Sequence, residues 1–580
     1  MPETARSAPA RAGGEFFASP VEATHRRYEA LRAYLYEGVP AAEAATRFGY
    51  TVGSLLSAAR DFRAGQRNFF VVARPGPKHA PAKEAARPKV IELRRAGHSI
   101  YEIAEALAHT PTPLNRTGVA EICAEEGFGR LWTRPVTERG GPRREVLPRA
   151  EVLDFAALPA RSQTRVAGLL LAIPDLLALD LPTMVTAAGY PSTSRIPAAS
   201  YLLSLLALKL VGIRRVSHVE DLAADPGAAL FAGLAALPKT TALSTYSYRL
   251  DHGKQRRFLA ALDAAALATG LATGEALNLD FHAVMHWGED AALEKHYVPR
   301  RSQRTRSVLT FFAEDATSHT LLYGNADLAK ATQAGEVLAF ADHWRDVTGR
   351  NPGLLVFDSK VTTQAQLAEL DARGIHFITL RARSTKLTEH LHALPANAWT
   401  PLTLARAGGK TRRVRVHEDP QARLSAYPGS IRQLAVTGLG HDEPTILITN
   451  DRDRPTKPVI EHYARRMNIE QRLAEAIRSF GLDALAGAVP LNVDLDVVLS
   501  VLAHTVCAAL RRRLPGYATA TPDTLQRRFL HTGGTILNQR NEITVRLNRR
   551  TYSPVLRQAD LPPTVTVPWW GDRRLRYEFT

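Results

Sequence analysis

The spacing of apolar residues changes from helical to strand-like along the chain, and these changes predict its elements. Over the first 135 residues, apolar positions recur every three or four residues between glycine turns, which predicts two sets of short helices. These helices are expected over 31–36, 41–48 and 51–62, and over 90–96, 100–108 and 115–126. Ser99 and Glu102 carry the signature of a capping box at the start of one of them.

Each set has the size of a helix-turn-helix unit. We expect such units over 21–72 and 79–135, after a flexible tail over 1–20 and with a linker over 73–78. The later helices of each unit would offer polar residues to a DNA major groove, with Arg60 and Arg116 as candidate contacts. Small three-helix units also occur in proteins that bind no DNA, so this pattern alone does not establish DNA binding.

Residues 150–270 keep a helical period throughout and predict a helical domain without recognisable chemistry. At about residue 276 the spacing of apolar residues changes from helical to strand-like. Strands are then expected over 277–284, 307–313, 318–323, 353–357 and 375–380, with helices over 328–348 and 364–373. The resulting order over 271–385 is βββαβαβ, with an acidic residue in the first strand and another after the fourth, which is the ribonuclease H-like arrangement.

A β-rich stretch over 386–444 follows and is interpreted as an insertion into this core. The core is expected to resume over 445–515, with a strand at 445–449 and helices over 458–480 and 495–510. The last residues, 516–580, include an alternating strand over 543–547 and predict a small β-appendage. The fold class expected is therefore multidomain α+β, in which helix-turn-helix units and a helical region precede an interrupted α/β core.

Charge and cysteine content narrow the kind of partner and compartment. The formal net charge is +17, from 74 Lys and Arg against 57 Asp and Glu, and it indicates a polyanionic partner such as nucleic acid. A high-GC coding sequence would also raise the arginine content. Cys123 and Cys507 are the only cysteines, which excludes a disulfide framework and fits a reducing cytoplasm. Polar residues interrupt the apolar runs 169–181 and 196–213, so we expect buried helices there and no membrane association.

Two aspartates in the predicted strands are the first candidates for chemistry. Cleavage of a phosphodiester by two metal ions needs carboxylates that hold both ions about 3.5 to 4 Å apart. Asp280 lies in an apolar strand, where an unpaired charge is costly, and Asp358 follows a buried strand at the carboxyl edge of the sheet. An Asp after a strand can also simply cap the next helix. The occurrence of both in this order of elements favours a metal site.

The helix predicted over 458–480 supplies a third carboxylate, Glu470. Tyr463, Arg466 and Glu470 fall at i, i+3 and i+7, so all three share one helix face. A structural salt bridge would account for Arg466 and Glu470 but not for the tyrosine.

The segment from Tyr463 to Glu470 resembles the Tyr-x2-Arg-x3-Glu-x6-Lys signature of the insertion-sequence DDE transposases that carry a β-insertion before the Glu. The pair Thr449 and Asn450 also resembles that family, and the resemblance covers roughly residues 200–515. It implies that Asp280, Asp358 and Glu470 are catalytic ligands of two Mg²⁺ ions, which Mn²⁺ can replace. It also implies that Tyr463 and Arg466 contact transposon-end DNA.

Two positions depart from that signature. Where the family has Lys, seven residues after Glu470, this chain has Ile477, and the neighbouring Arg478 is a candidate substitute although it is turned by about 100° on the helix. Met467 stands where the family often has Trp. Glu475 is the fallback third carboxylate, but its offset of five residues turns it away from Arg466 and Glu470.

Further basic residues extend the candidate DNA-binding set. The connection between the first two strands of the core carries a cluster that could grip phosphates, although a solvated basic loop has the same composition. The cluster comprises Lys295, Arg300, Arg301, Arg304 and Arg306, and Lys360 follows Asp358. His282 shares the strand face of Asp280, because it lies two residues further on.

The function expected is that of a transposase that cleaves double-stranded DNA at transposon ends and transfers the freed strand to target DNA. The resemblance adds that no covalent protein intermediate forms, and that a homodimer acts on paired ends in the bacterial cytoplasm at the nucleoid. One alternative is a sequence-specific DNA-binding protein derived from a transposase, which the missing lysine favours. Another is a ribonuclease H-like nuclease that cuts without strand transfer.

Overall fold

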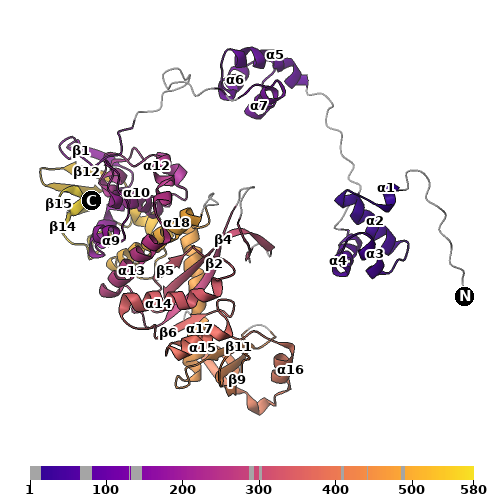
Figure 1. The fold of residues 1–580 in the computed structure, drawn as a ribbon. Coiled ribbons are helices and arrows are strands. Elements are labelled where there is room, and N and C mark those ends of the chain that lie inside the picture. Colours follow the sequence, from indigo (N-terminus) through magenta and orange to yellow (C-terminus); the bar gives the residue numbers. More distant parts are fainter. Residues whose placement is uncertain are drawn as a thin grey trace, which may run out of the picture. The chain divides into compact units, whose positions relative to one another are not determined.

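The protein is a multidomain α+β protein (Figure 1). The computed structural model describes residues 15–65, 69, 81–129, 131, 147–286, 293–298, 303–405, 411–439, 442–484 and 490–579. Most of the predicted tail and the linker predicted over 73–78 lie outside these residues. The chain divides into two compact units, Met1–Arg144 and Glu145–Thr580.

The first unit contains two small sets of helices, each with its own apolar core. The first set consists of α1 (Glu15–Ala18), α2 (Ala23–Leu35), α3 (Ala41–Arg47) and α4 (Val52–Arg63). The second consists of α5 (Pro81–Arg95), α6 (Ile100–Leu107) and α7 (Arg116–Glu125). The predicted capping box is confirmed, because the Ser99 hydroxyl accepts from the Glu102 amide and the Glu102 carboxylate accepts from the Ser99 amide. Helices α2 and α5 begin earlier than the sequence pattern predicts.

Short helices form most of the region up to residue 270. They are η2 (Ala167–Ala172), α8 (Ile173–Ala178), α9 (Leu181–Ala187), α10 (Ala198–Leu210), η3 (Val216–Asp221), α11 (Pro226–Ala232), α12 (Thr240–Ser244), η4 (Tyr246–Arg249) and α13 (His252–Ala268). The prediction of an entirely helical region is wrong at β1 (Arg161–Thr164), which pairs with β12 (Gly534–Asn538) near the other end of the chain. Local periodicity could not reveal this strand, because its partner lies far away in sequence.

A ten-stranded mixed sheet forms the centre of the second unit. Its first part has the order β5-β4-β2-β6-β7, in which β2, β6 and β7 are parallel and β4 is antiparallel to both of its neighbours. These strands are β2 (Leu277–Met285), β4 (Gln303–Asp315), β5 (Leu321–Asn325), β6 (Leu354–Phe357) and β7 (His376–Leu380). The short strand β3 (Lys295–Val298) pairs with β4. Helices η6 (Gln333–Gly335), α14 (Glu336–Thr348) and α15 (Gln364–Ala372) connect the later strands.

The strand predicted over 318–323 is β5, and it starts later than predicted, at Leu321. Asp315 is the reason, since its carboxylate accepts hydrogen bonds from the backbone amides of Thr317 and Ser318. His319 then adopts a positive φ of 57°. The segment predicted to begin this strand therefore forms a tight turn.

The predicted β-rich insertion extends the same sheet and does not form a separate one. After α16 (Thr385–Ala393) and η7 (Ala396–Ala398), three strands follow: β8 (Thr400–Ala405), β9 (Thr411–Ala422) and β10 (Ile431–Thr437). They join the sheet through β11 (Thr445–Thr449), which pairs antiparallel with both β7 and β10. The insertion is thus continuous with the strands that carry the candidate site.

Two long helices complete this unit, α17 (Thr456–Phe480) and α18 (Pro490–Arg513). Helix α17 packs against β2, β6 and β7, and α18 packs against β5 (Figure 1). By length and composition, α18 is apolar enough to cross a membrane from Asn492 to Arg513, but 94% of its apolar window is buried inside the protein. This burial is compatible with the core helix of a soluble protein.

The C-terminal strands form a second, five-stranded sheet of order β1-β12-β13-β15-β14. Besides β12 it contains β13 (Glu542–Leu547), β14 (Thr564–Val567) and β15 (Arg573–Phe579), and α19 (Pro522–Leu525), η9 (Gln526–Leu530), α20 (Ser553–Arg557) and η10 (Pro568–Trp570) connect them. Trp570 is buried and its indole N–H donates to the Leu230 carbonyl. The expected β-appendage is therefore packed against the helical region, and Trp570 serves this packing.

Candidate active site

The alternation of side chains along β2 and β6 places two predicted carboxylates on the same face of the central sheet. Ala276 and Val356 belong to the apolar cluster under α17, whereas Leu279 and Phe357 belong to the main core on the opposite face. Since side chains alternate with a period of two, Asp280 and Asp358 follow Ala276 and Val356 onto the α17 face. The strands are parallel with Leu279 opposite Phe357, so the next residues, Asp280 and Asp358, are neighbours.

Helix α17 brings the other three predicted residues to this face. Its apolar residues Val459 and Ile460 pack on the cluster that contains Val356, with Tyr463 at its edge. One and two turns further on, Arg466 and Glu470 follow on the same side of the helix. The packing of α17 on the sheet thus determines which side chains face the strand carboxylates.

Arg466 joins the carboxylates to one another. Its guanidinium Nη1 lies 3.4 Å from Asp280 Oδ2, and its Nη2 donates to Glu470 Oε1 at 3.3 Å. Its Cζ lies 5.6 Å from the centroid of the Tyr463 ring, in a cation–π contact. The Arg466 side chain is only 7% exposed, whereas that of Glu470 is 52% exposed. Asp358 accepts from the Ser359 hydroxyl at 3.1 Å and contributes to the field at Arg466.

Burial and charge shift the titration of this cluster. Burial raises the pKa of Asp280 to about 6, although the positive charge of Arg466 opposes this shift. Burial likewise raises the pKa of Tyr463 to about 12. Burial by itself would lower the pKa of Arg466, but the surrounding acidic groups, Asp280 above all, outweigh it and raise this pKa. Arg466 is therefore a permanent cation among the carboxylates.

The residues of the cluster fit a hard divalent cation. Asp280, Asp358 and Glu470 offer carboxylate oxygens, which Mg²⁺ prefers as protein ligands. The Arg466 guanidinium stands among them, and its buried Nε and Nη1 have no hydrogen-bond partner. In the described part of the chain, no group of three or more acidic, His or Cys side chains is close enough together to enclose an ion. The cluster therefore balances its negative charge with an arginine in this conformation.

The residues that stand where this chain departs from the signature, and the fallback carboxylate, also lie on α17. Ile477 is partly buried against the core, and the Arg478 backbone carbonyl accepts from Arg214 at 3.4 Å. Glu475, the fallback carboxylate, is buried and pairs with Arg472 at 2.8 Å, so it belongs to a different set of contacts. Met467 is 61% exposed and contributes nothing to the apolar core.

One contact of the site could not be predicted from the sequence. His282, on the same strand face as Asp280, is hydrogen-bonded through Nε2 to Asp483 Oδ1 at 2.8 Å. Asp483 follows the C-terminal end of α17, and no spacing in the sequence relates it to a residue 201 positions earlier. The histidine thus joins the end of α17 to β2 beside the carboxylates.

The predicted basic residues fall into three places. Arg304 and Arg306 alternate along the exposed N-terminal end of β4, with Lys295 directly opposite Arg306 on β3, whereas Arg300 and Arg301 lie outside the described residues. Lys360 is exposed just after Asp358. In the first unit, the Arg60 side chain is 78% exposed on α4, and Arg116 begins α7 with its Cζ 5.1 Å from the Tyr101 ring centroid.

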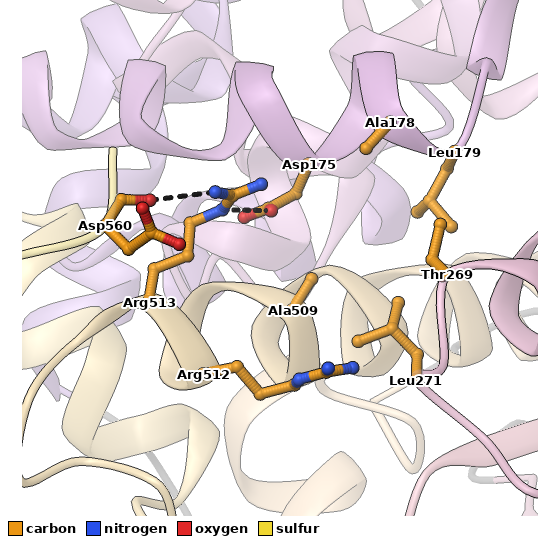
Figure 2. A pocket seen from close by; sticks show the side chains of 9 residues that line it. All are labelled: Asp175, Ala178, Leu179, Thr269, Leu271, Ala509, Arg512, Arg513 and Asp560. Atoms are coloured by element: carbon orange, nitrogen blue, oxygen red, sulfur yellow. Dashed lines mark hydrogen bonds and ion pairs between the residues drawn. The ribbon is translucent and has the colours of Figure 1, made fainter. Parts of the chain in front are cut away.

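A cavity of about 290 Å³ in the second unit is lined by none of the predicted residues (Figure 2). Arg513 of α18 occupies one side of it, with Nε donating to Asp175 Oδ1 at 2.6 Å and Nη1 donating to the Asp560 carbonyl at 2.8 Å. Arg512 donates to the Gly270 carbonyl. Since both arginines are held by protein acceptors, we assign this cavity a structural role.

Comparison with known proteins provides no relative. No protein-family model matches the chain, and no curated protein is significantly similar to it. The functional interpretation therefore depends on the residues and their geometry.

Proposed function

We propose that this protein is a DNA transposase of the DDE type, which cleaves double-stranded DNA at the ends of a mobile element and joins the freed 3′-hydroxyl to target DNA. The observation that carries the proposal is the cluster around Arg466: its buried guanidinium pairs with Asp280 on β2 and with Glu470 on α17, and Asp358 after β6 adds to the negative field there. A purely structural salt bridge would need one of these carboxylates, whereas three from distant parts of the sequence act on this one guanidinium.

The arrangement of strands supports the same proposal. The strands lie in the order β5-β4-β2-β6-β7. Strand β4 is antiparallel to β2 and β5, whereas β6 and β7 are parallel to β2, and this pattern supports a ribonuclease H-like core. The two aspartates belong to the central strand β2 and the adjacent β6, where a ligand can approach the carboxyl ends of parallel strands.

In this proposal Asp280, Asp358 and Glu470 hold Mg²⁺ or Mn²⁺, most simply as a pair of ions. The ions would activate the attacking oxygen and stabilise the leaving oxygen of the phosphodiester. Arg466 balances the carboxylates before DNA and metal bind, and Tyr463 orients the guanidinium through its ring. The half-exposed Glu470 is free to adjust its position, because it is not fixed in the core.

The basic residues would bind the DNA on which this site acts. Lys360 offers a cation directly after Asp358, and the exposed parts of β3 and β4 offer Lys295, Arg304 and Arg306 near the far end of β2. The first unit offers Arg60 and Arg116 on exposed helix faces. Such contacts neutralise phosphates and make binding depend on salt. We further infer that the protein works as a homodimer on paired ends, in the bacterial cytoplasm.

The test is cleavage and strand transfer of a duplex that carries the sequences flanking the gene, in Mg²⁺ or Mn²⁺. We expect the wild-type protein to cut and join, and Asp358→Asn and Glu470→Gln to bind the duplex but do neither. Glu475→Gln is the matched control on the same helix and should stay active, because Glu475 pairs with Arg472 outside the cluster.

Two results would contradict the proposal. Binding without cleavage by the wild-type protein would favour a DNA-binding protein that has lost its chemistry, and cleavage without joining would favour a nuclease. Loss of activity in Glu475→Gln but not in Glu470→Gln would show that the third carboxylate is wrongly assigned.

A further inference from the structure

A cleft of about 590 Å³ opens at the C-terminal end of α17. Its lining includes Ile477 and Asp483 from this end and Arg214, Arg215 and His218 from the segment that follows α10. We call it the Arg214 cleft. The two arginines were not singled out by any pattern in the sequence, since they lie in the helical region ahead of the predicted core.

Both elements that carry the candidate site lead into this cleft. Ile477 is seven residues after Glu470, which puts it on the same face of α17 and about 10 Å further along the helix. His282 is two residues after Asp280 on β2, and it is hydrogen-bonded to Asp483 in the lining of the cleft. The Arg214 cleft therefore continues the surface on which Asp280 and Glu470 lie.

The arginines are held against α17 by close backbone packing. Gly481, which ends α17 with a φ of 68°, leaves no room for a side chain, since a Cβ there would lie 2.8 Å from the Arg214 Cα. Lys209, at the end of α10, donates to the Phe480 carbonyl at 2.7 Å. Gln526 further donates to the carbonyls of both Lys209 and Ser479. The segment with Arg214 and Arg215 thus has a fixed position beside Ile477.

The guanidinium groups of this segment are available to an anion. Arg214 donates only to the Arg478 carbonyl, at 3.4 Å, and within the described residues the Arg215 side chain has no protein partner. Of the acidic groups in the lining, Asp483 is paired with His282, which leaves Asp221 to oppose two arginines. An arginine fork suits a phosphate, to which it can donate two hydrogen bonds.

We propose that Arg214 and Arg215 bind a phosphate of the DNA strand that leads away from the Asp280–Glu470 cluster, and so supply the positive charge that Ile477 does not. They act as positioning residues, because neither touches the cluster itself. This inference rests on the proposed function, since it takes the bound strand to be the one that the cluster cleaves.

The test compares binding of the duplex with the gene's flanking sequences, in EDTA and across a range of salt concentrations, with cleavage in Mg²⁺. In Arg214→Gln/Arg215→Gln we expect affinity to fall about tenfold and the slope of log K against log salt to decrease by about 1, since the one lost phosphate contact contributes about 0.9. Arg195→Gln is the control, because Arg195 is also exposed but precedes the other end of α10. The single variant Arg215→Gln removes a side chain that has no partner among the described residues and should show part of the loss.

Adding Ile477→Lys to the double variant tests the placement of the charge. Recovery of affinity and cleavage would support the inference, because a lysine at 477 would reach the same cleft. Unchanged affinity, salt slope and cleavage in the double variant would overturn it, even if the transposase proposal stands. A loss of affinity in a protein whose wild type never cleaves would support the phosphate site and contradict the proposed function.

Discussion

Arg466 is the residue that most directly determines the charge balance of this cluster. A guanidinium at 7% exposure loses most of its hydration, and only nearby negative charge compensates this cost. Asp280 supplies that charge, and burial shifts its pKa upward at the same time. Each of the two groups therefore offsets part of the cost of burying the other.

Arg466→Met should lower the free energy of unfolding by about 3 kcal/mol in EDTA, because it leaves Asp280 buried without a counter-charge. The melting temperature of this variant should then rise more with Mg²⁺ than that of the wild type, since an ion would take the place of the guanidinium. Thermal unfolding with and without Mg²⁺ measures both effects. Arg465→Met, an exposed neighbour on α17, should change neither. A destabilised Arg466→Met that shows no response to Mg²⁺ would count against a metal site.

Asp175, in the cavity of Figure 2, makes stability depend on pH. Burial raises the pKa of Asp175 to about 6, although Arg513 opposes this shift. The folded protein thus binds the proton more tightly than the unfolded chain, whose value is about 3.9. The contribution of this residue to stability is therefore present below about pH 4 and is lost as the pH rises through about 6.

We expect Asp175→Asn to gain about 3 kcal/mol relative to wild type between pH 4 and pH 7, since a shift of one unit corresponds to about 1.4 kcal/mol. Urea unfolding at a series of pH values measures the difference. The control Asp346→Asn alters an exposed carboxylate on α14 and should give a constant difference. A constant difference for Asp175→Asn as well would mean that the carboxylate stays ionised in the folded protein.

At the scale of elements, the ends of α10 and α17 are fixed to each other by one buried cation. Lys209 donates to the Phe480 carbonyl and lies 2.5 Å from Asp496 of α18, with 6% of the lysine and 10% of the aspartate side chain exposed. A positive charge at a helix C-terminus also interacts favourably with the helix dipole. This one buried cation therefore links three helices.

Lys209→Met should lower the free energy of unfolding by about 3 to 5 kcal/mol, because Asp496 is left buried and unpaired. The double variant Lys209→Met/Asp496→Leu should recover most of this loss, since it removes both charges. Denaturant titration of the wild type, Lys209→Met, Asp496→Leu and the double variant forms a double-mutant cycle. If the double variant is no more stable than Lys209→Met, the hydrogen bond to Phe480 and not the ion pair carries the effect.

At the scale of the whole molecule, the chain separates the part that would recognise DNA from the part that would cut it. The two helical sets before residue 144 have small cores of their own. The main apolar core draws its residues from Phe155 to Leu575, so both ends of the second unit contribute to it. The second unit should therefore fold without the first.

A protein that begins at residue 147 should unfold in one cooperative transition and keep the circular dichroism of the intact second unit. It should bind DNA with little preference for the flanking sequences, because it lacks Arg60 and Arg116. Competition between specific and unrelated duplexes measures this preference, which should be at least about tenfold in the full chain. An undiminished preference in the shorter protein would place recognition in the second unit.

The sequence by itself determined most elements of the central sheet and the faces of their side chains. Apolar side chains repeat every two residues along a strand and every three to four along a helix, because of local backbone geometry. The positions of Asp280 and Asp358 on strands, and the helix face shared by Tyr463, Arg466 and Glu470, could therefore be predicted. Only the tertiary structure decided that β1 pairs with β12, that the insertion extends the same sheet, and that Arg466 turns inward. It also decided that Arg214 packs beside Ile477. These contacts join segments far apart in the chain, and burial and charge compensation select them without leaving a local pattern.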